Sequence, residues 1–145
     1  MKHLSISLLF MALTAFKQQP SGTLTVNTNN YNNNNGKAVL LLFRKDDKIP
    51  NNPFNTIVTE IKDKKAVFEI QNIAFDDYVI ILLHDENDNG IIDHSFGLPS
   101  EQLGYSNNWE LGFFTGMPTF SKLKFQFSTS AQTQNITITY KKNKK

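Results

Sequence analysis

Tyr78-Val-Ile-Ile-Leu-Leu83 is the most hydrophobic stretch of the chain after its N-terminal segment. Polar residues bound it on both sides, with Asp76-Asp77 before it and His84-Asp85 after it. A short, continuous apolar run between turn-forming residues is typical of a strand that is buried on both faces. We therefore expect residues 78–83 to form a fully buried β-strand.

Strand-like segments continue on both sides of this run. Apolar residues alternate with polar ones, or run together briefly, at residues 22–27, 37–45, 56–61, 65–70, 123–127 and 136–140. Between them lie an asparagine-rich run at 29–35, expected to be a solvated hairpin loop, and a proline-containing loop at 46–55. No segment shows a convincing helical period. Seven short strands at this spacing predict an all-β fold, an antiparallel β-sandwich of Greek-key type.

The N-terminus has the layout of an export signal. Lys2 and His3 precede about a dozen mostly apolar residues that end at Phe16, a run too short to span a bilayer. The alternative is a buried N-terminal strand or helix. We expect a signal peptide at 1–20, a single β-sandwich domain at 21–141 and a basic tail at 142–145. No cysteine follows the apolar run, which excludes a lipid anchor at that point.

Charge is distributed unevenly along the 145 residues, a length that suits one domain. Residues 66–121 contain nine acidic residues and no lysine or arginine, so they carry −9 while the rest of the chain carries +11. Nucleic acid would be repelled by such a segment, so it is excluded as a partner. The absence of cysteine excludes disulfides, thiolate metal sites and cysteine nucleophiles.

The motif with the clearest chemistry directly follows the apolar run. His84-Asp-Glu-Asn-Asp-Asn-Gly-Ile-Ile-Asp93 contains the D-x-[DN]-x-[DN]-G pattern of an EF-hand-type calcium loop, with Asp85 at position one. Alternate residues of such a loop turn oxygen atoms toward the ion, and Gly90 permits the sharp turn. The expected metal ligands are Asp85, Asn87, Asn89, the carbonyl of Ile91, Asp93 and, from farther along, Glu101.

The calcium loop is incomplete. Phe96 occupies position twelve, where a bidentate glutamate is usual, so we expect weak binding, with a dissociation constant on the order of 10⁻⁴ to 10⁻³ M. The alternative is a tight Asn/Asp/Gly turn that holds no ion. A transition-metal site that pairs His84 with His94 would lack a third histidine nearby, and His84 is equally explained as a ring bonded to a loop carbonyl.

Three runs of sequence resemble a known family. Residues 78–93 resemble its HDxNxNGxxD core, residues 96–108 its GxPxExxGxSNN run, and Met117-Pro-Thr-Phe120 its PxF element. These runs are similar to domain-of-unknown-function family 2141, a bacterial family of exported proteins, over roughly residues 22–140. Asp76-Asp77 and Val79 depart from the glycine and alanine usual there.

The resemblance implies a secreted or periplasmic β-sandwich that looks similar to immunoglobulin-like, transthyretin-like and collagen-adhesin B-type modules. It implies no established enzymatic activity. From the family pattern only the loop positions Asp85, Asn87, Asn89, Gly90 and Asp93, together with Glu101, carry over to this chain.

A long connection rich in aromatic residues separates Asp93 from Lys122. One interpretation is a recognition surface for a glycan or peptide, formed by Tyr105, Trp109, Phe113 and Phe114. The other is that these rings cover the open part of the fold and bury the ion loop. A hydrolase is the weakest alternative, because no G-x-S-x-G, H-E-x-x-H or glycine-rich phosphate loop occurs.

These features together predict an exported, calcium-stabilised module of the periplasm or cell exterior. It would serve as a structural or binding protein of the cell envelope, with a glycan or another envelope protein as partner. No transmembrane segment is expected in the mature chain.

Overall fold

The computed structural model describes residues 19–91, 93–95, 98–112 and 114–139. The expected signal peptide and basic tail lie largely or wholly outside these residues. The longer strands are β1 (Ser21–Asn29), β2 (Lys37–Phe43), β3 (Asn55–Thr59), β4 (Lys65–Ala74), β5 (Asp76–Asp85) and β10 (Ala131–Thr137). The shorter elements are β6 (His94–Ser95), β7 (Leu98–Pro99), β8 (Leu103–Tyr105), the 3-10 helix η1 (Ser106–Asn108), α1 (Phe120–Leu123) and β9 (Phe125–Phe127).

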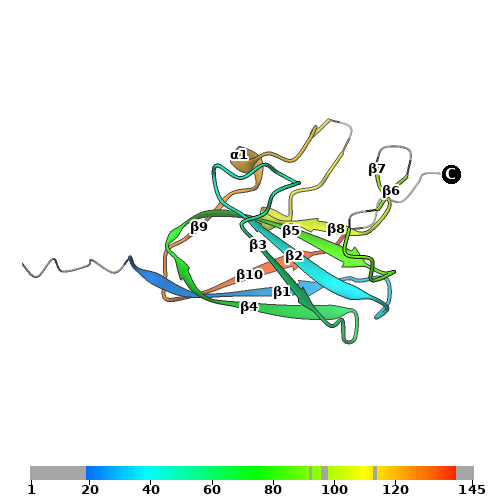
Figure 1. The fold of residues 1–145 in the computed structure, drawn as a ribbon, viewed down its shortest axis with the longest axis horizontal. Coiled ribbons are helices and arrows are strands. Elements are labelled where there is room, and N and C mark those ends of the chain that lie inside the picture. Colours follow the sequence, from blue (N-terminus) through cyan, green and yellow to red (C-terminus); the bar gives the residue numbers. More distant parts are fainter. Residues whose placement is uncertain (1–18, 92, 96–97, 113, 140–145) are drawn as a thin grey trace, which may run out of the picture.

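The described strands form two main sheets and one small ribbon (Figure 1). One sheet has the order β10-β1-β4, and the other has the order β3-β2-β5-β8 with β9 also paired to β5. The ribbon consists of β6 and β7. Most neighbouring strands are antiparallel, so the predicted all-β class is confirmed.

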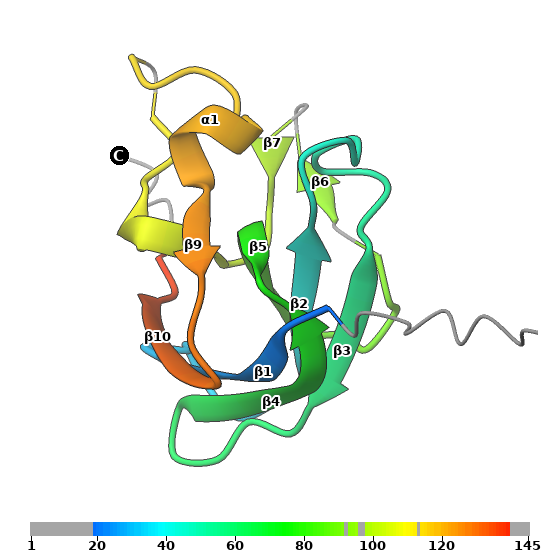
Figure 2. The same cartoon turned by 90° about the vertical axis from the view of Figure 1, so that its left-hand side faces the viewer.

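The main core lies between the two sheets, which face each other in Figure 2. Alternation explains how β1 and β4 contribute to it: Leu24 and Val26 of β1, and Phe68 and Ile70 of β4, point inward while their neighbours face outward. Strand β5 differs because all its residues from Tyr78 onward are buried, as its unbroken apolar run predicts. Its two faces therefore belong to different hydrophobic clusters.

The last strand corrects one expectation. β10 runs parallel to β1, pairing Thr23 with Ala131 and Asn29 with Thr137, whereas the sequence predicted antiparallel pairing throughout. The reason lies in where the chain enters the sheet. The backbone N–H of Thr23 donates to the carbonyl of Ser130 at 2.9 Å, so β10 begins beside the start of β1 and must run in the same direction.

One edge of β5 is completed by two separate pieces of chain, β8 with the adjoining Ser106 and, later in the sequence, β9. β8 pairs with Ile81–Leu83 and β9 pairs with Asp76–Tyr78, which leaves Val79 and Ile80 between them. The buried hydroxyl of Ser106 fills this gap: it accepts a hydrogen bond from the Ile80 N–H (3.1 Å) and lies 2.6 Å from the Leu123 carbonyl, to which it donates. Ser106 therefore joins β5 to the end of α1 where no strand pairs.

A backbone bridge links the two main sheets at β8. Leu103 pairs with Leu83 of β5 and also forms an isolated bridge with Thr139, just beyond β10. The Thr139 N–H donates to the Leu103 carbonyl at 2.8 Å. On the opposite side of the fold, β3 and β4 are the outer strands of their sheets and are joined only near the turn between them, at the Lys62–Lys65 bridge.

All seven predicted strands exist, with altered ends. Leu123 ends α1 instead of beginning a strand, and β10 starts at Ala131, earlier than the predicted position 136. Sequence analysis missed β6, β7 and β8 in the long connection after Asp93. These strands are two or three residues long, too short to produce an alternating pattern.

Replacing Ser106 tests the completed edge of β5. Ser106→Ala leaves the Ile80 N–H and the Leu123 carbonyl without this partner in the core, so we expect a loss of about 1–3 kcal/mol in the free energy of unfolding. Denaturant unfolding measures it. Ser128→Ala, at an exposed serine, is the control and should change stability by less than about 0.5 kcal/mol. Equal effects of the two variants would contradict this role of Ser106.

Candidate metal centre

The predicted ion loop begins at the end of the buried strand β5. Asp85 is the last residue of β5 and is only 1% exposed, and the residues from Glu86 to Ile91 are exposed. Asp88 and Gly90 adopt left-handed backbone conformations, with φ of 57° and 75°. The chain therefore turns sharply where the glycine of the motif predicts it.

The Asp85 carboxylate organises the turn. Its Oδ2 accepts a hydrogen bond from the Gly90 N–H at 2.8 Å, and its Oδ1 accepts one from the Asn89 N–H at 3.1 Å. Because Asp85 is held by β5, these two bonds fasten the tip of the loop to the core.

The two asparagines of the motif meet Asp93. The Asn87 and Asn89 side-chain amides donate to the two Asp93 carboxylate oxygens at 2.7 and 3.1 Å. Their own side-chain oxygens accept backbone N–H groups, Asn87 from Asn89 and Asn89 from Ile91, at 3.1 and 2.9 Å. This is the hydrogen-bonded Asx turn that the sequence analysis gave as the alternative to an ion site.

Glu101 joins the cluster from beyond the β6–β7 ribbon. Its Oε2 accepts the Asp93 N–H at 3.0 Å, whereas its Oε1 is buried and has no hydrogen-bond partner among the described residues. Burial raises the pKa of the Glu101 carboxyl; the Asp93 N–H opposes this, and the negative charges of Asp93 and Asp85 add to the rise.

Five of the six predicted ligands therefore lie in one cluster: Asp85, Asn87, Asn89, Asp93 and Glu101. The sixth, Ile91, donates its N–H to Asn89 and exposes 62% of its surface. In the part of the chain that is described, no three His, Asp or Glu side chains are close enough to hold a metal by themselves. None of the three ion pairs between described residues involves a carboxylate of this cluster.

A buried polar network supports the first residue of the loop. The ring nitrogens of His84 face the Gln102 side-chain oxygen (3.2 Å) and the Asn35 carbonyl (2.9 Å). The same Gln102 oxygen accepts the Asn32 N–H at 2.7 Å, and Tyr31 packs edge-on against the His84 ring at 5.3 Å. The His84 ring therefore bonds to a loop carbonyl, that of Asn35, as the interpretation without a transition metal expected.

Sequence analysis missed the role of the asparagine-rich loop. We expected residues 29–35 to be solvated, but Tyr31 is 1% exposed and the backbone of the loop bonds to His84 and Gln102. Gly36 also lies against the start of the ion loop. Its φ is 66°, and there is no space for a side chain, because an added Cβ would lie only 1.9 Å from the Asp85 carbonyl oxygen. A tyrosine within a run of asparagines was the one available signal.

The aromatic connection covers the outer face of β5. Tyr105 is 4% exposed and packs edge-on against Trp109, with ring centroids 5.1 Å apart. Both belong to the second hydrophobic cluster, on the face of β5 that points away from the main core. Phe114 is 96% exposed, and Phe113 lies outside the described residues. Tyr105 and Trp109 therefore cover the sheet, as the second interpretation of this segment expected. That interpretation also expected the rings to bury the ion loop, which they do not, because residues 86–91 are exposed.

Two glycine substitutions test this support of the loop. Gly90→Ala meets no atom within 4 Å, so it should cost only the strain of a left-handed residue, about 1–2 kcal/mol. Gly36→Ala places a methyl group against the Asp85 backbone and should cost clearly more. Thermal unfolding of both variants measures the difference. Equal losses would mean that the asparagine-rich loop does not pack tightly against the ion loop.

Comparisons with known proteins identify the family of the chain and nothing more specific. Curated proteins and solved structures gave no match to the chain. The model of domain-of-unknown-function family 2141, described as uncharacterised proteins conserved in bacteria, matches residues 26–135. This match spans most of the chain and includes β5, the ion loop and Glu101. The resemblance found from the residues is therefore confirmed, and the chain belongs to this bacterial family of uncharacterised proteins, domain-of-unknown-function family 2141.

Proposed function

We propose that the protein is an exported module of the bacterial cell envelope whose ion loop binds calcium and thereby stabilises the fold. The observation that carries the proposal is the buried Oε1 of Glu101, which has no hydrogen-bond partner among the described residues and lies close to the charges of Asp93 and Asp85. A buried carboxylate oxygen without a hydrogen bond is costly, and a divalent cation would satisfy it and offset the mutual repulsion.

The donor set has the chemistry that calcium prefers. Calcium takes six to eight oxygen ligands from carboxylates, amides, backbone carbonyls and water. Turning the Asn87 and Asn89 amides over would direct their oxygens, in place of their nitrogens, toward Asp93. Binding would then replace the Asx turns with ion contacts, and the net gain would be small, consistent with weak affinity.

The finer architecture belongs to the same proposal. Two facing sheets with a shared core support an immunoglobulin-like or transthyretin-like Greek-key β-sandwich. In that role the module would be a structural or binding protein and not an enzyme. Recognition of a glycan or peptide by the aromatic connection is less favoured, because Tyr105 and Trp109 are used in packing.

Export is tested by the fate of the N-terminus. We expect the full chain, expressed in a bacterium with a C-terminal tag, to be recovered outside the cytoplasm and to begin between residues 16 and 21. Cell fractionation and N-terminal sequencing measure this. No helix among the described residues is long and apolar enough to cross a membrane. Recovery of an intact Met1 in the cytoplasm would contradict the proposal.

Calcium binding is tested by thermal unfolding in EGTA and in calcium, with magnesium as the ion control. A dissociation constant near 10⁻⁴ M should add about 1.5–3 kcal/mol of stability at roughly 1–10 mM calcium by mass action. The quantity to compare is the increase caused by calcium, because Asp85 also caps the loop without any ion.

Four variants sharpen the calcium test. Asp85→Ala and Asp93→Ala should lose the calcium-dependent increase, while Asp88→Ala, at an exposed position between the ligands, should keep it. Glu101→Gln should unfold no earlier than the unaltered protein in EGTA, since it removes a repelled charge, yet respond less to calcium. Equal calcium responses in all four variants would overturn the ligand assignment.

A further inference from the structure

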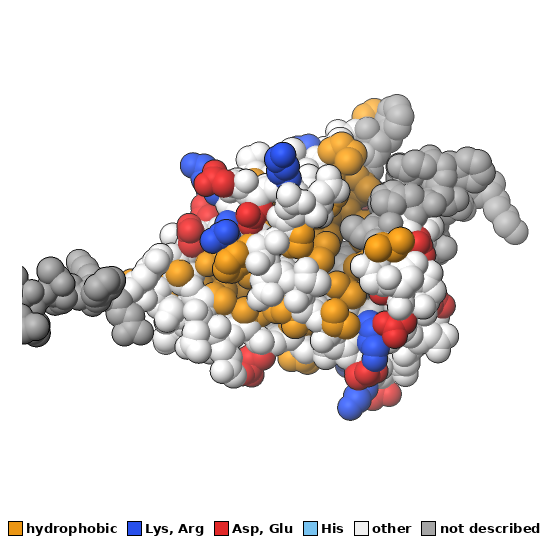
Figure 3. Space-filling view, viewed as in Figure 1, with side chains coloured by type: hydrophobic (Ala, Val, Ile, Leu, Met, Phe, Trp, Pro, Cys, Tyr) orange, Lys and Arg blue, Asp and Glu red, His pale blue; other side chains and the backbone are white. Residues whose placement is uncertain are grey.

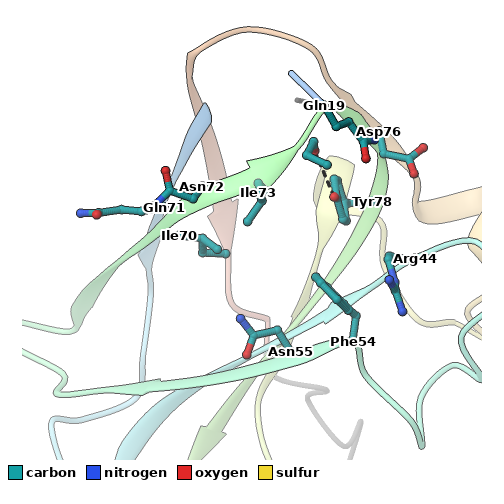
Figure 4. A pocket seen from close by; sticks show the side chains of 11 residues that line it. Gln19, Arg44, Phe54, Asn55, Ile70, Gln71, Asn72, Ile73, Asp76 and Tyr78 are labelled. Carbon is teal, nitrogen blue, oxygen red and sulfur yellow. Dashed lines mark hydrogen bonds between the residues drawn. The ribbon is translucent and has the colours of Figure 1, made fainter. Parts of the chain in front are cut away.

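A cleft of about 490 Å³ lies at the other end of β5, between the two main sheets. It opens where the outer strands β3 and β4 separate, away from the Lys62–Lys65 bridge that joins them. In Figure 4, Ile70 and Ile73 of β4 form one wall, and Arg44, Phe54 and Asn55 come from the opposite side. Its volume falls within the range of ligand cavities, roughly 300–1,000 Å³.

The cleft has an apolar floor. Ile70, Ile73 and Tyr78 are 4%, 8% and 2% exposed, so these side chains are rigidly held by the core. The Tyr78 hydroxyl donates to the Ala74 carbonyl at 3.0 Å, which fixes the ring and leaves the oxygen able to accept (Figure 4). Figure 3 shows hydrophobic side chains gathered across the middle of this side of the molecule, with charged ones toward its ends.

Arg44, the only arginine of the chain, is held at the entrance. Its guanidinium carbon lies 4.0 Å from the centroid of the Phe54 ring, a cation–π arrangement that orients the planar group. Its Nε is 3.8 Å from the nearest Asp47 oxygen, too far for a hydrogen bond. The guanidinium therefore presents N–H donors that no described residue uses.

The remaining polar groups of the rim are mostly uncharged. The side-chain amides of Gln19, Asn55 and Asn72 line the cleft and form no hydrogen bond with any described residue. Asp76 is the only acidic residue of the lining. Arg44 also forms an ion pair with Asp47, so two carboxylates offset its positive charge. Both charges act on the Tyr78 hydroxyl: burial and Asp76 raise its pKa, and Arg44 lowers it.

This lining discriminates among ligand classes. A purely apolar ligand would cover the free amides without satisfying them, at a cost for each polar group. An anion would pair with Arg44 but would be repelled by Asp76. A neutral ligand with several hydroxyl groups can both donate and accept, as amides do. Its C–H surface can rest on the Phe54 ring, which lines the cleft and is 44% exposed.

From this arrangement we propose that the cleft between β3 and β4 binds a neutral saccharide of one or two sugar units. Arg44, Asp76 and the Asn55 amide bond its hydroxyl groups, and the exposed Phe54 ring supports its apolar face. The site does not depend on the calcium loop, because the cleft contains the first residues of β5 and the ion loop follows its last. It also differs from the aromatic connection, where the sequence suggested glycan recognition.

The test is a nuclear magnetic resonance titration of the isotope-labelled protein. The neutral probes are cellobiose, maltose, N,N'-diacetylchitobiose and mannobiose, and the anionic probes are glucuronate and citrate. We expect at least one neutral probe to shift the amide signals of Asn55, Gln71 and Asn72, equally in EGTA and in calcium. Persistence in EGTA separates this proposal from the calcium proposal.

Matched variants locate the site. Arg44→Ala and Asn55→Ala should each weaken binding about tenfold, through loss of a polar contact to the ligand. Lys45→Ala, which removes a neighbouring exposed positive charge, should leave the affinity unchanged. All of these positions are exposed, so the variants should fold, as thermal unfolding will verify. Binding of the anionic probes alone, shifts confined to the aromatic connection, or no shift with any neutral probe would each overturn the proposal.

Discussion

The burial of β5 imposes a requirement that the rest of the structure satisfies. A strand enclosed on both faces must have its N–H and C=O groups paired within the protein, because water cannot reach them. β2 pairs along one edge over seven residues. Along the other edge, β8, the Ser106 hydroxyl and β9 supply the partners in succession. The chain after the ion loop must therefore return to β5 twice, first at β8 and Ser106 and then at β9. Much of the chain after Asp93 is arranged by this requirement.

The buried strand β5 also fixes the position of the groups at its two ends. At its end, Asp85 and His84 connect the core to the ion loop on one side and to the asparagine-rich loop on the other. At its start, Tyr78 forms the floor of the cleft. Each of these residues is anchored in the core and places polar atoms near the surface. Such anchoring can fix loop conformations in a fold that has no disulfides.

The elements that sequence analysis recovered are those with a local physical signature. The apolar run of β5, the alternation in β1 and β4, and the glycine and asparagine spacing of the ion loop all act within a few residues, and they proved correct as structure. What was missed depends on distant partners. Ser106, Gln102 and Arg44 are ordinary residues in the sequence, and only the folded chain brings Ile80, His84 and Phe54 to them. The parallel direction of β10 likewise follows from where the chain enters the sheet, which no local pattern encodes.

That parallel pairing has a mechanical consequence. β1 and β10 lie side by side over seven residue pairs and point the same way, so the chain enters this pair at one end and leaves it at the other. Tension applied between the segments that precede β1 and follow β10 acts along the strands and pulls them past each other. All the hydrogen bonds between them then share the load, whereas a hairpin pulled from its open end breaks them one by one. In a protein held at both ends, two strands paired in this way would thus resist stretching.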